Sequence, residues 1–247
     1  MKKAALYFHQ GWTDIINCLA LINYYAERYD HLTLVMRQDA HPIVNYYVQQ
    51  FNNVNVDYYY MSDLDINLGG VAANYSDMTL LFLGVHDAVR NDGSKNVFRT
   101  TKTDTFFVAK FYLCYGVDYM TRISHFNLSR ASKLEDQVFE IFTANHGKDY
   151  VLYHEDLERD IVLNKTGFKR GAAWVDLDKK SYIFFDYLKV MENANEMHLI
   201  DSVWAAVVYQ IDARFGLFRN IPITVHCLRG YREMFQEPVR LPNWSIL

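Results

Sequence analysis

Three polar segments of this 247-residue sequence carry residue types that can bind an anion or move a proton. The first is His9–Asp14, where Gly11 permits a tight turn or a close backbone approach to a ligand. Trp12 and Thr13 follow, and Asp14 stands in the first turn of a predicted helix, where a carboxylate can accept a proton from an attacking hydroxyl. The alternative is that Thr13 or Asp14 only caps that helix. The further glycines of a dinucleotide-binding fingerprint are missing.

The second segment is Tyr153–Arg159, in which several ionisable residues follow a buried apolar strand. His154 and Glu155 leave that strand, and Arg159 has the guanidinium geometry that holds a phosphate through two hydrogen bonds. A metal site made by His154 and Glu155 is disfavoured, because adjacent residues of a strand point to opposite faces. A solvated charged loop is the alternative interpretation.

The third segment is His198–Trp204, where a predicted strand leads directly into a helix. The Ser202 hydroxyl and the free amides that begin at Val203 are typical of an anion site, which the helix dipole favours. A diphosphate suits such a site, and His198 precedes it on the strand. Asp201 alone is more often a cap. Arg229, at the end of the last predicted strand, is a further candidate for the same region.

The elements that position these segments form two strand–helix series. Short apolar runs predict strands, and apolar residues at helical spacing predict helices between them. The first series has strands at 4–9, 31–36, 53–60 and 78–85, with helices at 12–29 and 42–51. The second has strands at 150–154, 172–177, 196–200 and 223–228, with helices within 127–146 and at 181–194 and 203–215.

Such alternation indicates an α/β fold with parallel sheets, whose ligands bind beyond the carboxyl ends of the strands. We therefore expect two Rossmann-like domains, residues 1–125 and 126–247, facing each other across a cleft.

Composition excludes several classes of function. With 25 Lys and Arg against 29 Asp and Glu, the net charge of −4 argues against a nucleic-acid partner. The three cysteines are far apart and form no CxxC pair, so a disulfide framework and a cysteine zinc site are disfavoured and a reducing cytoplasm is expected. We expect no bound metal. No apolar run reaches the length of a signal peptide core or of a transmembrane helix.

The chain resembles the GT-B glycosyltransferases, and within them the heptosyltransferase and fucosyltransferase-like groups. In those groups a Gly-x-Gly-Asp turn typically follows the first strand, and here it reads Gly11-Trp12-Thr13-Asp14, with Thr13 in place of the second glycine. The segment 194–202 resembles their donor-site strand and helix, and 150–155 resembles the first strand of their donor domain. This resemblance implies a compact GT-B-like fold with an N-terminal acceptor domain and a C-terminal nucleotide-sugar donor domain.

The resemblance also implies an activity. It is the transfer of a sugar from a nucleotide-diphosphate sugar to a hydroxyl of a glycan or lipid-linked saccharide, with inversion and without a metal or other cofactor. Asp14 would be the base. The donor would be bound by His154, Glu155, Arg159, His198, Asp201, Ser202 and Val203, and the acceptor cleft would include Gly11, Trp12, Thr13 and Arg229.

Two other functions remain open. One is another nucleotide-sugar enzyme, such as an epimerase, which would use the same donor without an acceptor. The other is a nucleotide- or sugar-binding protein that keeps the fold and has lost catalysis, which the altered glycine turn favours.

Overall fold

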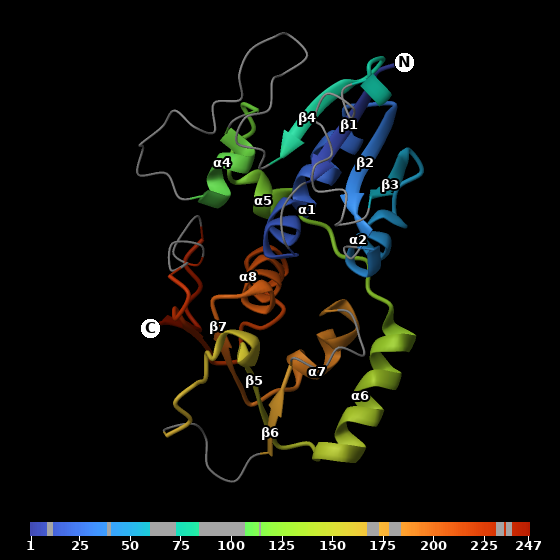
Figure 1. Ribbon diagram of the computed structural model, residues 1–247. Coiled ribbons are helices and arrows are strands. Elements are labelled where there is room, and N and C mark those ends of the chain that lie inside the picture. The colour runs from blue at the N-terminus through green and yellow to red at the C-terminus, as the bar shows by residue number, and fades with distance from the viewer. Residues whose placement is uncertain are drawn as a thin grey trace. The chain divides into compact units, whose positions relative to one another are not determined.

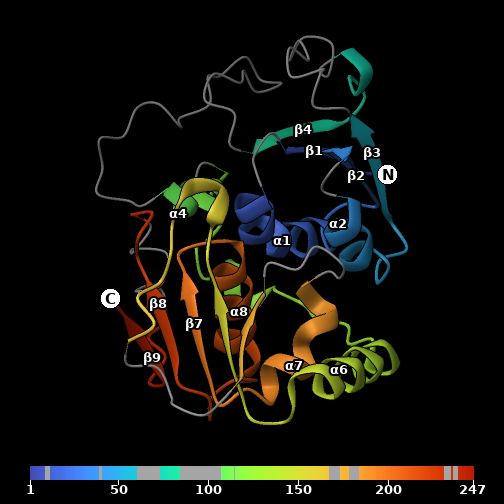
Figure 2. The same ribbon diagram turned by 60° about the horizontal axis from the view of Figure 1, so that its bottom comes forward.

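The computed structural model divides the chain into two compact units, Met1–Asn127 and Leu128–Leu247. Figures 1 and 2 show their helices and strands. The structure describes residues 1–8, 12–38, 41–59, 73–83, 107–113, 115–166, 173–177, 184–230, 235 and 239–247. Within these ranges, residues 12–14, 37, 41, 42, 59, 82, 83, 107 and 174 are described by their backbone alone.

The N-terminal unit is built on a parallel four-stranded sheet in the order β3-β2-β1-β4. Its strands are β1 (Lys3–Phe8), β2 (His31–Arg37), β3 (Val54–Tyr59) and β4 (Thr79–Leu83). Five consecutive residues of β1 are buried. The apolar run at 4–8 therefore forms an inner strand of the sheet, paired with β2 on one side and β4 on the other.

Helices of the N-terminal unit pack on this sheet and on one another. They are α1 (Trp12–Ala26), α2 (His41–Val48), α4 (Phe107–Leu113) and α5 (Thr121–Ser124). The helix α1 begins at the carboxyl end of β1 and packs against α4 and α5 as well as β2. The Tyr112 hydroxyl donates a 2.5 Å hydrogen bond to the Asn17 carbonyl, which joins α4 to α1.

The C-terminal unit has a second parallel sheet, in the order β6-β5-β7-β8-β9. The strands are β5 (Tyr150–His154), β6 (Ala173–Asp176), β7 (Glu196–Ile200), β8 (Ile223–His226) and β9 (Trp244–Ile246). The helices are α6 (Ser132–His146), α7 (Leu188–Glu192) and α8 (Val203–Phe215). Figure 2 shows α8 alongside β7, against which it packs.

Specific contacts fasten these helices to the sheet. The Tyr150 hydroxyl of β5 donates a 2.7 Å hydrogen bond to the Val190 carbonyl of α7. At the edge formed by β9, the Trp244 indole donates a 2.8 Å hydrogen bond to the buried Asp212 carboxylate of α8. Both sheets are parallel, as the sequence predicts.

The helix expected within 127–146 is α6, which begins at Ser132 and ends at His146. Another predicted helix differs in the structure. The helix expected at 181–194 is a 3-10 turn at Phe184–Tyr187 followed by α7, and residues 181–183 lie outside the described part. Because residues three apart align in a 3-10 turn, Phe184 and Tyr187 both contact the Trp204 ring.

The strand β9 is not predicted by the sequence. The predicted strands otherwise agree with the observed ones to within a few residues over the part of the chain that the structure describes.

Candidate functional site

One edge of the second sheet gathers most of the predicted donor residues. The register pairs His154 with Leu199 and Ile200 with His226, so β5, β7 and β8 end at the same level. The Asp201 amide continues this pairing by donating to the His226 carbonyl at 3.2 Å. Residues that follow these strands are therefore neighbours at the carboxyl edge, where parallel sheets bind ligands.

Asp201 links two of these strand ends. Its side chain is 1% exposed, and its Oδ1 accepts a 2.8 Å hydrogen bond from the Arg229 backbone amide. This contact holds the segment after β8 against the start of α8. Asp201 is not the N-cap of α8, because that position belongs to Ser202.

Ser202 is the N-cap of α8 but does not cap it through its side chain. Its backbone is extended, and the Ala206 amide donates to its carbonyl at 3.0 Å. The Ser202 Oγ is buried and has no hydrogen-bond partner in the described part of the chain. Leaving such a group buried costs about 1–3 kcal/mol. The hydroxyl and the first amides of α8, including that of Val203, make the start of this helix suited to an anion.

His154 ends β5 on the same face of the sheet as α8. Its side chain is buried, and its ring centroid lies 6.4 Å from that of Trp204 in the first turn of α8. The pKa of His154 is lowered from 6.5 to about 4, chiefly by burial; the Asp156 carboxylate opposes this shift and the nearby Arg229 charge adds to it. Its Nδ1 has no hydrogen-bond partner among the described residues. A neutral imidazole is therefore available to donate or accept one hydrogen bond at this edge.

Arg229 is half-buried and close enough to His154 for its charge to act on that imidazole. The structure thus brings Arg229 to the same edge as His154 and Ser202. Arg159 is largely exposed, and its guanidinium forms an ion pair with the Asp156 carboxylate.

Glu155 uses both carboxylate oxygens within its own loop. Its Oε1 accepts from the Leu163 amide at 2.7 Å, and its Oε2 lies 3.0 Å from the Lys165 ammonium. The carboxylate is buried.

His198 lies on the other face of the sheet from His154. The register pairs His198 with Tyr153, while His154 pairs with Leu199, and successive residues of a strand point to opposite faces. The His198 ring stacks on that of His226 with centroids 5.5 Å apart, and its Nδ1 is 3.2 Å from Nε2 of His226. Burial lowers the pKa of both imidazoles. The structure does not bring His198 together with His154 and Ser202.

The predicted acceptor residues are only partly described. Gly11 lies outside the described residues, while Trp12, Thr13 and Asp14 form the first turn of α1 and are described by their backbone alone. Their place at the carboxyl end of β1 matches the prediction that this turn follows the first strand.

Trp204 has no role predicted from the sequence. Its ring is 4.5 Å from that of Phe184, centroid to centroid, and it lies beside His154 at the start of α8. The sequence feature that could have indicated Trp204 is its position, as an aromatic residue in the first turn of a helix predicted to bind an anion.

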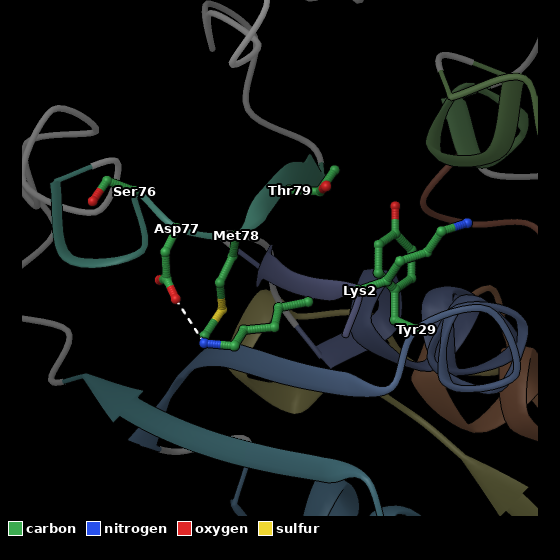
Figure 3. Close-up of a pocket in the computed structure, with 7 residues that line it drawn as sticks. Lys2, Tyr29, Ser76, Asp77, Met78 and Thr79 are labelled. Carbon is green, nitrogen blue, oxygen red and sulfur yellow. Dashed lines mark hydrogen bonds and ion pairs between the residues drawn. The ribbon is translucent and has the colours of Figure 1, made fainter.

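A hollow of about 410 Å³ lies elsewhere, in the N-terminal unit (Figure 3). It is lined at the amino ends of β1 and β4 by Lys2, Lys3, Tyr29, Ser76, Asp77, Met78 and Thr79. Lys3 and Asp77 form an ion pair of 2.7 Å there. Because it lies at the amino ends of parallel strands, this hollow is at the wrong edge of the sheet for the predicted site.

Within the described ranges, no three His, Cys, Asp or Glu residues are grouped closely enough to hold a metal ion. The same part of the chain has no helix with the length and apolar character that crossing a membrane requires.

The chain matches no family model and none of the curated proteins by sequence. Its structure is similar to that of a glycosyl transferase family 9 protein from Veillonella parvula DSM 2008, with a TM-score of 0.60 and 12% identity over 100% of this chain and 85% of that one. It is also similar to the E. coli ADP-heptose lps heptosyltransferase II, with a TM-score of 0.54 and 10% identity over 100% of this chain and 90% of that one. At such low identity the likeness concerns the fold. The chain therefore has the GT-B-like fold of these two structures, which confirms the fold resemblance predicted from the sequence.

Proposed function

We propose that this protein is a glycosyltransferase that moves a sugar from a nucleotide-diphosphate sugar to a hydroxyl of a glycan or lipid-linked saccharide. The observation that carries this proposal is the start of α8, where the buried Ser202 hydroxyl has no partner among the described residues. It lies in a fold shared with a glycosyl transferase and a heptosyltransferase.

The donor diphosphate is bound at this helix start in our proposal. The Ser202 hydroxyl and the amides from Val203 onward donate to its oxygens, and the helix dipole favours its negative charge. Arg229 contributes positive charge beside His154. His154 is neutral at pH 7, so its imidazole can donate a hydrogen bond to a phosphate or a ribose without adding a positive charge to that of Arg229. Arg159 is a further donor candidate if its ion pair with Asp156 opens.

The transfer itself requires a base and a stabilised leaving group. The acceptor hydroxyl attacks the anomeric carbon and loses its proton to Asp14, while the bond from that carbon to the diphosphate oxygen breaks. The electron pair of this bond remains on the nucleoside diphosphate, whose charge is stabilised at the start of α8. Because the transfer is a single direct displacement, the configuration at the anomeric carbon is inverted. In our proposal the charge of the leaving diphosphate is stabilised without a metal ion.

The test combines donor binding with turnover. Calorimetry with ADP, GDP and UDP measures binding, and release of nucleoside diphosphate from the matching sugar nucleotides measures turnover, with and without an acceptor panel and with EDTA present. Ser202→Ala removes one hydrogen bond to a charged group, worth about 1.5–3 kcal/mol, and should weaken diphosphate binding about tenfold or more. Asp14→Asn should keep binding and lower turnover about 100-fold or more.

Ser245→Ala is the matched control, since Ser245 is an exposed serine on β9 of the same unit. Sugar release or isomerisation without an acceptor would favour an epimerase-like enzyme. Binding without turnover on any acceptor would favour a binding protein. The proposed function is refuted if no nucleoside diphosphate binds, or if Ser202→Ala binds as tightly as the wild type.

A further inference from the structure

The loop after β5 is a closed structure whose two ends are tied together. The Asp156 and Ile161 backbones exchange two hydrogen bonds, of 3.0 and 2.9 Å, as an antiparallel bridge. Between them the chain forms a 3-10 turn at Leu157–Arg159 and reverses at Asp160, whose φ of 56° lies in the left-handed region. The chain thus returns to the end of β5 after a few residues.

Glu155 fastens the returning chain to the sheet. Its carboxylate is 4% exposed and holds the Leu163 amide and the Lys165 ammonium, one on each oxygen. The Lys165 ammonium also lies 3.9 Å from the centre of the Tyr153 ring. A buried carboxylate with two such partners is held in a fixed position, because breaking either contact leaves a buried charge without compensation.

The fastened loop contacts the strand that leads to the proposed donor site. The Leu163 side chain is buried against Ile200, with Tyr153 and Ile161 packed around the pair. Ile200 is the last residue of β7 and directly precedes Asp201 and Ser202. A shift of the returning chain is therefore transmitted to the residue next to the anion site.

We propose that Glu155 is a positioning residue for the donor site, which holds Leu163 against Ile200 and does not touch the donor. This inference rests on the proposed function. Its basis is the chain of contacts from the Glu155 carboxylate through the Leu163 amide to the Leu163 side chain and Ile200.

The experiment uses the full chain with three variants. Glu155→Ala removes both contacts, while Glu155→Gln keeps an oxygen for the Leu163 amide. Glu158→Gln is the control, because Glu158 is exposed on the same loop. Calorimetry measures the dissociation constant of whichever of ADP, GDP or UDP binds the wild type most tightly. Amide hydrogen exchange of residues 157–165 reports on the loop without any ligand.

We expect Glu155→Ala to accelerate exchange of the Leu163 amide at least tenfold and to weaken nucleotide binding about tenfold. Glu155→Gln should keep most of the protection of the Leu163 amide and most of the nucleotide affinity. Glu158→Gln should change neither the exchange rate nor the affinity. If Glu155→Ala does not fold, Glu155→Asp replaces it, since the shorter side chain keeps the charge but draws the carboxylate away from the Leu163 amide and should weaken nucleotide binding severalfold.

The outcomes separate the two proposals. A wild type that binds no nucleoside diphosphate overturns the proposed function and this inference with it. The inference alone is overturned if the wild type binds a nucleotide and Glu155→Ala exchanges its loop amides faster but binds that nucleotide with unchanged affinity. A Gln variant as weak as the Ala variant also overturns it, because the positioning contact would then not be the cause.

Discussion

Acidification should destabilise the C-terminal unit through His154, which ends β5 beside Trp204. In the folded chain, burial holds the pKa of this imidazole at about 4, against an ordinary value of 6.5. The unfolded chain therefore binds the proton more readily than the folded one between these two values. Stability is fully present above pH 6.5 and is lost as the pH falls toward 4.

The size of the effect follows from the two pKa values. The difference of about 2.5 between the two pKa values corresponds to at most about 3.5 kcal/mol, at about 1.4 kcal/mol for each pKa unit. Between pH 7 and pH 4.5 the loss attributable to this one group is about 2 kcal/mol. Burial also lowers the pKa of His198 and His226, so these two contribute in the same direction.

Urea unfolding followed by tryptophan fluorescence measures this loss. Three of the four tryptophans, Trp174, Trp204 and Trp244, lie in the C-terminal unit, so the signal reports mainly on it. His154→Gln should reduce the difference in unfolding free energy between pH 7 and pH 4.5 by about 2 kcal/mol. His125→Gln, in the N-terminal unit, is the control. A His154→Gln variant with the full pH dependence of the wild type would refute the assignment to His154.

Two further substitutions test contacts that hold the C-terminal unit together. Asp201→Ala leaves the Arg229 amide without its acceptor and should cost about 1–3 kcal/mol of unfolding free energy, whereas Asp201→Asn keeps an acceptor and should cost less than half of that, both measured by urea unfolding. Arg130→Met leaves the buried Glu135 carboxylate without its ion pair and also breaks the 2.7 Å contact with Glu192, so it should cost about 2–3 kcal/mol. The double variant Arg130→Met/Glu135→Leu should recover most of this in the same assay, and no recovery would contradict the proposed cause.

Local patterns in the sequence were sufficient for the elements that carry the site. The apolar run at 196–200 followed by Asp201 and Ser202 predicts both β7 and the start of α8, because strand and helix periodicity meet there without a break. The three-residue β9 carries too little periodicity for prediction. Its position depends on the contact of Trp244 with Asp212, which lies 32 residues earlier in the chain.

The individual roles at the site were harder to predict than its location. The resemblance groups Glu155 with His154 as donor residues. In the structure the Glu155 carboxylate accepts from the Lys165 ammonium and from the backbone amide of Leu163, and no side-chain pattern reveals the second of these contacts. His198 looks equivalent to its neighbours until the register places it on the opposite face, stacked on His226. Whether Asp14 acts as the base stays a prediction, because its side chain lies outside the described part.

The helix α8 has a consequence for how any anion at its start would respond to solution conditions. Nine consecutive residues, Trp204–Asp212, are buried, so most of this helix has no contact with bulk solvent. Mobile ions screen charges at a surface over about 8 Å at physiological ionic strength but act much less on buried groups. Ser202, directly before this helix, is buried too, so its hydrogen bond to a phosphate should be screened less by salt than the contacts of a basic surface patch, and that part of the affinity should persist in concentrated salt.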